Sequence, residues 1–395
     1  MKVKTLGIDL AKETFGLHGV DGRGRVVVHK RVTRKQLLGF LVQLEPCLVG
    51  MEACGSAHYW AREIEKLGHT VKLMSPQFVV PYRKGNKNDP NDAAAICEAV
   101  TRPSMRFVPI KSEAQQDIQA LHRVREQLIK NRTALANQIR GLLRERGIVV
   151  ARAITRLRAA LPLILEDESN RLSALMRELL SEMAERLRTL DDHLRQYDQR
   201  IARCCQQDER CRRLIKVEGV GPLVATAVVA AIGNGRQFKN GRELSAWLGL
   251  VPRQHSSGQR TVLLGISKRG DRYLRTLLVH GARAASAVAE RKGDARSIWV
   301  SRLKLRRGPN VAAVALANKN ARVLWALLAR NDSYRPPTIA GGRATSSLRL
   351  KPDRAAVAAR SARTGAPSPG SVTPPARLRA ARLIPADAAP APGSK

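Results

Sequence analysis

Residues 2–20 have the sequence KVKTLGIDLAKETFGLHGV, and this stretch decides the fold class. Apolar and polar side chains alternate in Lys2–Leu10 and again in Thr14–Val20, which is typical of β-strands. The segment Asp21-Gly-Arg-Gly-Arg25 is a turn signal, and Val26–Val32 follows as a third strand-like stretch. Because short connections join these stretches, the sequence predicts three antiparallel strands at the start of the chain.

The next part of the chain alternates helix-like and strand-like segments. In order, these are a helix at Arg34–Leu44, a strand at Leu48–Met51, a helix at Ala57–Leu67, a strand at Thr70–Met74 and a helix that begins near Asp89. The order βββαβαβα places parallel crossovers after the three antiparallel strands. It predicts an α/β domain of the RNase-H-like type.

Residues 112–205 change to a long helical periodicity. Apolar side chains recur at steps of three and four residues, first over 121–142 and then over 172–201. The pattern predicts two long, coiled-coil-like helices that break near Leu161-Pro162. Periodicity leaves open whether they form an antiparallel hairpin within the chain or a contact between two copies.

The rest of the chain completes four predicted domains. Residues 212–330 are typical of a mainly helical domain with a loop–strand insert near 250–266. Beyond Asn331 the chain is rich in Pro, Ala and Arg and too poor in apolar surface to fold, which predicts a disordered basic tail. The predicted domains are 1–108 (RNase-H-like), 109–208 (long helices), 209–330 (mainly α, C-terminal) and 331–395 (tail).

The chain is strongly basic. Its 395 residues include 70 Lys and Arg against 33 Asp and Glu, a formal net charge of +37. Such a chain repels itself unless a polyanion neutralises it, and nucleic acid is the natural polyanion. We find no apolar run of about 18 residues for a membrane span and no signal-peptide pattern, so we expect a cytoplasmic, nucleoid-associated protein. The six cysteines have neither CxxC nor zinc-ligand spacing, which predicts reduced structural thiols.

Four acidic side chains stand out in this basic chain. Asp9 lies at the end of the first predicted strand, and Glu52 follows the fourth. Asp89 and Asp92 lie where a helix starts, and their spacing of three residues puts the two side chains near each other. Taken singly, each could be a turn or cap residue, with Asp89 suited to an N-cap, and Glu13 is an alternative to Asp9.

Taken together, the four acids point to metal-dependent cleavage of nucleic acid. Carboxylates that converge from separate elements are the ligands that hard divalent cations prefer, so the set predicts a Mg²⁺ (or Mn²⁺) site. Cleavage of a phosphodiester passes through a highly anionic transition state, and two divalent ions roughly 4 Å apart stabilise the attacking and leaving oxygens.

Two glycines in the C-terminal half precede a predicted helix. Gly219 and Gly221 lie within the three residues before Pro222, and this pattern predicts a helix, a Gly-x-Gly hairpin and a second helix. Glycine lets the backbone approach a phosphate closely, and free amides at a helix start bind anions. The pattern resembles a helix-hairpin-helix that binds the DNA backbone, and the alternative is a plain tight turn between two helices.

Residues 248–260, LGLVPRQHSSGQR, form a predicted polar loop after a helix, with two serines, Ser256 and Ser257, and with His255 nearby. On the residues alone a turn role is favoured, because a nucleophilic serine needs activation and a charge-stabilising environment. Positive side chains that could contact phosphate lie nearby, at Arg253, Arg260, Lys268 and Arg269.

The predicted helix Asp271–Ala285 adds further cations. These are Arg272, Arg275 and Arg283. We interpret them as a phosphate-facing surface, and a solvated helix face is the alternative. Aromatic residues make up only 4% of the chain, so base stacking on aromatic platforms is not expected to dominate binding.

Several of these segments resemble one known family. GIDLAKE (7–13), GMEACGSAHYW (50–60) and KGNKNDPNDAAAI (84–96) resemble the DEDD-type insertion-sequence transposases, whose N-terminal domain is similar to the RuvC resolvase. PRQHSSGQR and GISKRGDRYLRTLLVHGARA (265–284) resemble their C-terminal transposase domain, so the likeness extends to about residue 330. It implies a metal site made of Asp9, Glu52, Asp89 and Asp92. It also implies that the serine before the glycine, Ser257, is the nucleophile, with Ser256 in reserve.

The resemblance also implies partners. Members of this family act as dimers or tetramers on element ends and target DNA, guided by a structured non-coding RNA, the bridge RNA. We therefore expect a Mg²⁺-dependent DNA recombinase with a transient phosphoserine link. Two alternatives stay open. One is a Holliday-junction-type or structure-specific endonuclease that uses only the four acids and water. The other is a nucleic-acid-binding protein with a decayed catalytic domain.

Overall fold

The computed structural model of the chain describes residues 2–84, 89–258 and 260–336, without the side chains of Asp89 and Pro90. The predicted 331–395 tail lies outside the described residues from residue 337 onward. The N-terminal part is a six-stranded sheet in the order β3-β2-β1-β4-β5-β6. Its strands are β1 Thr5–Leu10, β2 Thr14–Val20, β3 Val26–Thr33, β4 Leu48–Glu52, β5 Thr70–Met74 and β6 Phe107–Val108.

Strand directions in this sheet follow the predicted order. β2 is antiparallel to both β1 and β3, whereas β4 is parallel to β1 and to β5. The prediction of an α/β domain with three antiparallel strands and later parallel crossovers is confirmed.

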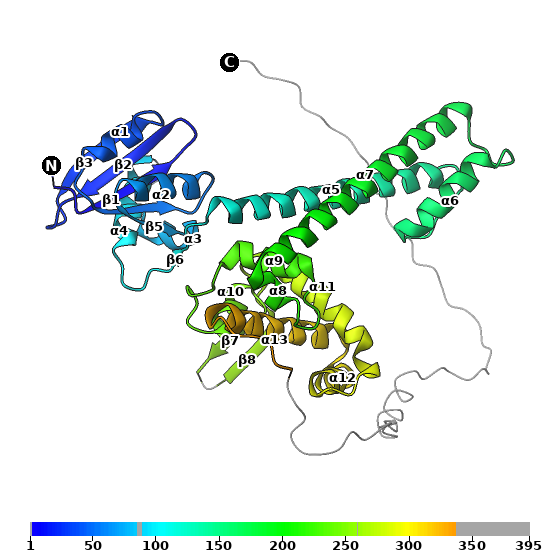
Figure 1. The fold of residues 1–395 in the computed structure, drawn as a ribbon. Helices are drawn as coiled ribbons and strands as arrows, with labels where there is room; N and C mark the ends of the chain where they lie inside the picture. Colours follow the sequence, from blue (N-terminus) through cyan, green and yellow to red (C-terminus); the bar gives the residue numbers. More distant parts are fainter. Residues whose placement is uncertain (1, 85–88, 259, 337–395) are drawn as a thin grey trace, which may run out of the picture. The chain divides into compact units, whose positions relative to one another are not determined.

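The two faces of the sheet carry different side chains. Ile8 of β1 and Met51 of β4 are fully buried in one apolar cluster with α1, Leu37–Val42, and α2, Ala57–Lys66. The alternate strand positions face α4, Asp89–Val100, which packs on β1, β2 and β4 (Figure 1). The period of two along a strand therefore separates an apolar core from the face on which the candidate acids lie.

The connecting elements of this domain differ from the prediction in small ways. α1 begins at Leu37, later than predicted, because the side chain of Gln36 accepts hydrogen bonds from the amide and hydroxyl of Thr33 and turns the chain there. α3, Pro76–Val79, the 3-10 helix η1, Val80–Tyr82, and β6 have no counterpart in the prediction, because such short elements carry no periodic signal. α4 begins at Asp89, as predicted to within one residue, and the N-cap role of Asp89 stays a prediction.

The long-helix region contains three helices instead of two. They are α5 Glu113–Arg144, α6 Ile154–Glu166 and α7 Ala174–Gln207. The predicted break at Leu161-Pro162 is wrong, because Pro162 lies inside α6. The chain breaks instead on both sides of α6, first at Gly147, whose φ of +78° is a conformation that glycine adopts readily after the end of a helix.

The apolar stripes of these helices meet within one chain. Ile139 of α5, Leu157 of α6 and Leu187 of α7 are buried in a shared cluster. Arg132 of α5 pairs with Asp191 of α7 at 3.1 Å, and Arg125, earlier in α5, bonds to the later Asp198, so α5 and α7 run antiparallel. Of the two predicted alternatives, the structure contains the hairpin, and a contact between copies stays a prediction.

The described residues of the C-terminal part, 209–258 and 260–336, are helical apart from one β-hairpin. Its elements are α8 Glu209–Leu214, α9 Pro222–Ile232, α10 Gly241–Trp247, β7 Pro252–Ser257, β8 Arg260–Ile266, α11 Arg272–Val288, η2 Ala289–Arg291, α12 Ala295–Arg307 and α13 Pro309–Ala329. One apolar cluster joins these helices, and Leu316 and Leu324 of α13 are buried in it. The limits predicted for the four domains stay predictions.

α13 corrects one expectation about membranes. By length and composition alone it is apolar enough to cross a membrane, so the prediction that the chain has no such run was wrong. Half of its apolar window is buried inside the protein, and it packs on α10, α11 and α12. This is typical of the central helix of a folded core.

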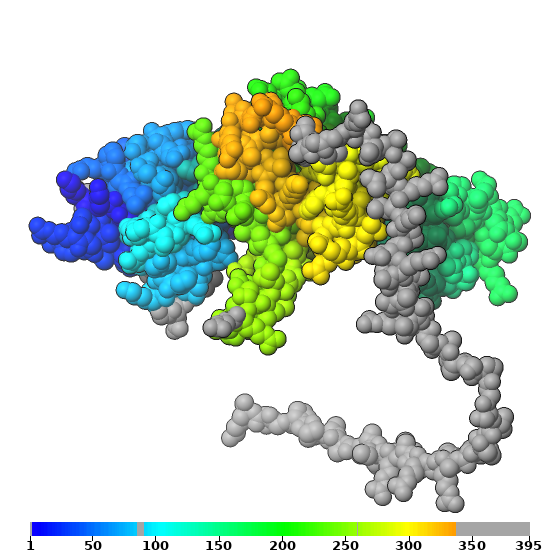
Figure 2. Space-filling view, turned by 90° about the horizontal axis from the view of Figure 1, so that it is seen from below, coloured from blue at the N-terminus to red at the C-terminus, as the bar shows by residue number. Residues whose placement is uncertain are grey.

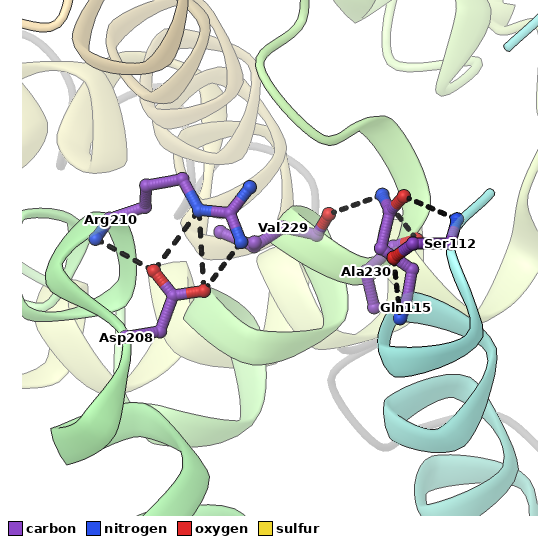
Figure 3. Close-up of polar contacts among 6 residues, drawn as sticks. All are labelled: Ser112, Gln115, Asp208, Arg210, Val229 and Ala230. Carbon is purple, nitrogen blue, oxygen red and sulfur yellow. Dashed lines mark hydrogen bonds and ion pairs between the residues drawn. The ribbon is translucent and has the colours of Figure 1, made fainter. Parts of the chain in front are cut away.

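Capping side chains determine where two helices begin. Ser112 Oγ accepts from the amide of Gln115, and Gln115 Oε1 accepts from the amide of Ser112, a capping box at the start of α5. The side-chain amide of Gln115 also donates to two carbonyls in the last turns of α9, at 3.4 and 3.5 Å (Figure 3). Asp208 caps α8 by accepting from the amide of Arg210, whose guanidinium it also binds (Figure 3).

A buried polar network joins α5 to α9 and α11 through His122. Its Nε2 lies 2.9 Å from the hydroxyl of Thr226, and its Nδ1 lies 2.9 Å from that of Tyr273. Thr226 donates its own proton to the carbonyl of Pro222, so it accepts from Nε2–H, and Nδ1 accepts from Tyr273. This arrangement needs a neutral imidazole. Burial, and then the positive charge of Arg125, lowers the pKa of His122 to about 4.

The His122 network predicts a pH-dependent stability. Because folding lowers its pKa, the contribution of His122 is fully present above its ordinary pKa of 6.5 and is lost as the pH falls from there towards 4. A shift of this size corresponds to at most about 3 kcal/mol of unfolding free energy. We expect the hydrogen-exchange protection factors of the α9 amides, each taken relative to the intrinsic exchange rate at the same pH, to fall over this pH interval in the wild type, and less so in His122→Gln.

His58→Gln is the matched control for this experiment. Burial, and then the charges of Lys111 and Arg62, also lowers the pKa of His58 to about 4, but His58 belongs to the sheet domain. This variant should leave the pH dependence of α9 unchanged. An α9 response that is the same in wild type and His122→Gln would contradict the assignment.

Candidate active site

Asp9 and Glu52 end two neighbouring parallel strands. In the register of β1 and β4, Ile8 lies opposite Met51, so Asp9 and Glu52 follow side by side. Both residues are half-buried. Since side chains alternate along a strand, both lie on the α4 face of the sheet, opposite to the buried Ile8 and Met51.

Two glycines let α4 approach this face closely. A Cβ at Gly7 would lie 2.3 Å from the carbonyl oxygen of Ala93, and one at Gly50 would lie 2.8 Å from an α4 side chain, so no larger residue fits at either position. Further back on β1, the carbonyl oxygen of Thr5 lies 3.7 Å from the thiol of Cys97. α4 therefore runs antiparallel to β1, and its first turn lies at the end of β1.

The other two predicted acids belong to that first turn of α4. The side chain of Asp92 is 19% exposed, and its carboxylate pairs with Nη1 of Arg83 at 3.3 Å. Arg83 was not predicted as a site residue, because the only local signal is a cation nine residues before an acid. The side chain of Asp89 lies outside the described residues.

The described acids have the right chemistry for a divalent metal. The thiol of Cys54, just after β4, has a raised pKa because of burial and then because of the negative charges of Glu52 and Asp9. Negative charge thus gathers at this edge of the sheet, and carboxylate oxygens are the ligands that Mg²⁺ prefers. Among the described side chains no three His, Cys, Asp or Glu form a ready-made metal cluster. Asp89, the fourth predicted ligand, is not among those side chains.

The two candidate serines lie on a hairpin, so the predicted polar loop is wrong. β7 and β8 are antiparallel, with Ser256 opposite Thr261 and Ser257 opposite Arg260, and Gly258 at φ +55° begins the two-residue connection. Every residue of β7 is exposed, and the hairpin, in yellow-green, projects from the surface (Figure 2). A strand that is polar on both faces lacks the apolar alternation by which strands are predicted.

The two serines point to opposite faces of this hairpin. Ser256 Oγ accepts a hydrogen bond from Nε2 of Gln254 at 2.9 Å. Ser257 shares the other face with His255, two residues earlier, and with Arg260, directly across the hairpin. The Ser257 face therefore carries a potential proton acceptor and a permanent positive charge.

The two glycines before α9 have different surroundings. α9 begins at Pro222, as predicted. Gly219 has a φ of +78°, and a Cβ there would lie 2.7 Å from the carbonyl oxygen of Gly281 in α11, so this glycine permits a close backbone crossing inside the protein. A Cβ at Gly221 would meet no described atom within 4 Å. Open space for a phosphate therefore lies at Gly221 and not at Gly219.

The predicted phosphate-binding cations also differ from one another. Nη1 of Arg275 donates to the carbonyl oxygens of Leu248, at 2.9 Å, and Arg269, at 2.8 Å. This half-buried guanidinium ties α11 to the segments before and after the hairpin. The exposed side chains are those of Arg253, Arg260, Lys268, Arg269, Arg272 and Arg283.

Replacement of Arg275 and of Arg272 should therefore have different effects. Arg275→Met removes the donor for two carbonyls, and we expect a loss of about 1–3 kcal/mol in the free energy of unfolding, seen in thermal denaturation. Arg272→Met should leave stability unchanged but weaken DNA binding and reduce its salt slope by about 1. Equal loss of stability in the two variants would contradict this distinction.

Comparison with known proteins assigns the family. The model of DEDD transposases of the IS110 type matches residues 6–147, and that of the Transposase IS116/IS110/IS902 family matches residues 211–297. The chain is 54% identical over 340 residues to a probable family 20 transposase of Pseudomonas aeruginosa, covering 85% of this chain and 100% of that protein. The chain belongs to the IS110 family of DEDD transposases.

Two further relatives are transposases of named insertion sequences. The chain is 48% identical over 333 residues to the transposase for insertion sequence element IS1111A of Coxiella burnetii, covering 84% of this chain and 92% of that protein. It is 40% identical over 332 residues to the transposase for IS1328 of Yersinia enterocolitica, covering 84% of this chain and 98% of that protein. An IS110-family transposase cleaves and recombines DNA, and its DEDD domain implies the use of divalent metal in general.

Proposed function

We propose that this transposase cuts and exchanges DNA strands with Mg²⁺ or Mn²⁺ held by Asp9, Glu52, Asp89 and Asp92. The observation that carries the proposal is that Asp9 and Glu52 lie side by side and face the start of α4. When bound, the metal stabilises negative charge on the scissile phosphate and its leaving oxygen. Asp9 and Glu52 bind it through carboxylate oxygens, and Arg83 holds the Asp92 carboxylate in position.

We also propose that Ser257 is the nucleophile. His255 accepts the proton of the serine hydroxyl, a bond forms between Oγ and phosphorus, and one phosphorus–oxygen bond of the strand breaks. The leaving oxygen takes up a proton, and the strand remains attached as a phosphoserine ester. Arg260 offsets the negative charge of the phosphate. A hydroxyl from the second DNA then displaces the serine, so the number of phosphate ester bonds is conserved and no energy source is needed.

The nucleic-acid partners follow from charge and family. We propose that element ends and target DNA pair with a structured non-coding RNA in the cytoplasm, and that a dimer or tetramer assembles on them. The net charge of +37 supports an assembly rich in polyanion. Exposed cations contact the phosphates, together with the open start of α9 at Gly221 as a helix-hairpin-helix. These cations are Arg253, Arg260, Lys268, Arg269 and Arg272.

A reconstituted strand-exchange reaction tests this function. It combines purified protein, element-end DNA, target DNA and the RNA transcribed from the same element. We expect exchange with Mg²⁺, none after chelation with EDTA, and none with RNA-free protein. Exchange in EDTA would contradict the metal site. Equal exchange of the same DNA sites by RNA-free protein would contradict the RNA guide.

A further inference from the structure

A wide groove lies between α10, the β7–β8 hairpin, α12 and α13, with a volume of about 1220 Å³. Its floor is apolar and includes Leu264 and Ile266 of β8, Trp299 of α12, and Val311 and Val314 of α13. Leu264 is 47% exposed and Val311 is 51% exposed, although both are aliphatic. An open apolar surface of this kind is typical of a binding site.

The rim of this groove is positively charged. Its ionisable side chains are Arg242, Lys319, Arg322 and Arg330, and no carboxylate among the described residues lines it. The three arginines are exposed and form no ion pair within the described part of the chain. Nζ of Lys319 lies 4.6 Å from the ring centre of Trp299, and burial, then the charges of Arg296 and Arg322, lowers the pKa of Lys319. The protein thus leaves positive charge in the groove without a partner.

The occupant must combine negative charge with apolar surface. A single DNA strand does so, because its phosphates and the faces of its bases are both exposed. In a duplex, neighbouring base pairs cover the base faces. A second copy of this chain, which carries a net charge of +37, complements the positive rim less well than a polyanion does.

The proposed function selects DNA over RNA for this strand. One polar atom of each amide that lines the groove is engaged within the protein: Asn240 caps α10, Asn310 accepts from Arg283, and Asn318 donates to a backbone carbonyl. Single strands of DNA and of RNA both stack their bases on apolar side chains, so the chemistry proposed for Ser257 on DNA decides the choice.

We propose that this groove binds a single-stranded segment of DNA, with phosphates on Arg242, Arg322 and Arg330 and base faces on the apolar floor. One wall of the groove is β8, and Ser257 lies at the tip of the same hairpin. A strand in the groove therefore runs along the hairpin that carries the candidate nucleophile. The choice of DNA as the strand rests on the proposed function, whereas the groove and its charge do not.

Binding of oligothymidine of about 20 nucleotides tests the groove directly. The full chain carries Ser257→Ala, and the buffer contains EDTA, so that neither serine nor metal takes part. We expect Arg322→Ala with Arg330→Ala to weaken binding by at least about tenfold and to lower the salt slope by about 1.4, or 0.7 for each phosphate contact. Arg146→Ala with Arg156→Ala removes the same charge from exposed positions outside the groove and should change binding less than about twofold.

Two further measurements report on the floor. Val311→Asp should weaken binding without loss of the fold, because Val311 is half exposed. A strand with 5-iododeoxyuridine should cross-link on irradiation to Trp299 or to α13, as mapped by mass spectrometry.

The outcomes separate the groove from the catalytic proposal. The proposal that the groove binds the strand would be wrong if cross-links formed only outside Trp299 and α13. It would also be wrong if the groove variants and the control variants lost affinity equally. RNA of the same sequence that displaces the DNA would assign the groove to RNA and overturn the choice of DNA. Unchanged affinity with an altered oligomer size would make it a protein interface. The binding assay uses neither metal nor serine, so an inactive protein that still binds the strand would contradict only the catalytic proposal. A protein that cleaves DNA but does not bind the strand in the groove would contradict only the groove proposal.

Discussion

Asp9→Asn is expected to abolish DNA strand cleavage while leaving the fold intact. Asparagine has the size of aspartate but lacks the charge, so the metal loses an anionic ligand at the end of β1. Metal stabilisation of the transition state contributes several kcal/mol, and each 1.36 kcal/mol is a factor of ten in rate. We therefore expect cleavage of element-end DNA to slow by about 10³-fold or more. Single-turnover cleavage on denaturing gels measures this loss, and calorimetric titration of Mn²⁺ measures the loss of the ligand.

Glu13→Gln is the matched control for Asp9→Asn. Glu13 is exposed and lies between β1 and β2, beyond the strand end, and it is the one alternative acid in this segment. We expect its replacement to leave cleavage and Mn²⁺ affinity near the wild-type values. If Glu13→Gln abolished cleavage and Asp9→Asn did not, the metal site would have been assigned to the wrong acid.

Ser257→Ala is expected to eliminate the covalent protein–DNA adduct and with it all strand exchange. Without the hydroxyl no phosphoserine ester forms, so the loss should reach the detection limit of the gel. The protein is incubated with labelled element-end DNA, its RNA and Mg²⁺, then denatured and separated. Asp9→Asn should also lack the adduct, because attack by the serine needs the stabilised phosphate.

Ser256→Ala provides a control one residue away. Ser256 lies on the opposite face of the hairpin and bonds to Gln254, so its loss should leave adduct formation near wild type. His255→Gln should slow adduct formation by about 10²–10⁴-fold if His255 is the proton acceptor. If Ser257→Ala still cleaved DNA without an adduct, Ser257 would not be the nucleophile. That result would favour an endonuclease that uses the four acids and water.

The fold of the sheet domain could be predicted because its signals are local. β2 and β5 have the predicted bounds, because the alternation of apolar and polar side chains can be seen in the sequence of each strand by itself. The adjacency of Asp9 and Glu52 follows from strand order, because the carboxyl ends of parallel neighbours meet at one edge of a sheet. The assignment of a role to each acid came from family resemblance and not from this pattern.

Features that depend on distant contacts could not be predicted. In the sequence, Arg275 has the same pattern as an exposed helix cation such as Arg272. Only its hydrogen bonds to the carbonyls of Leu248 and Arg269 distinguish it. Gly219 looked like part of a phosphate loop, whereas its partner is a backbone more than sixty residues later, at Gly281. The groove brings together side chains of three helices and the β7–β8 hairpin, none of which has a pattern that indicates binding when taken alone.

The C-terminal core extends beyond residues 211–297, which are the residues that the Transposase IS116/IS110/IS902 family model matches. Leu316 and Leu324 of α13 are buried in that core, and His122 of α5 is hydrogen-bonded to α9 and α11. A fragment cut at the limits of the likeness would expose apolar surface and leave Thr226 and Tyr273 without their partner. A chimera that transfers the serine hairpin into a related transposase should therefore carry α5 through α13 as one block. We expect reassortment between insertion sequences to face the same restriction, because a breakpoint inside this block would separate these contacts.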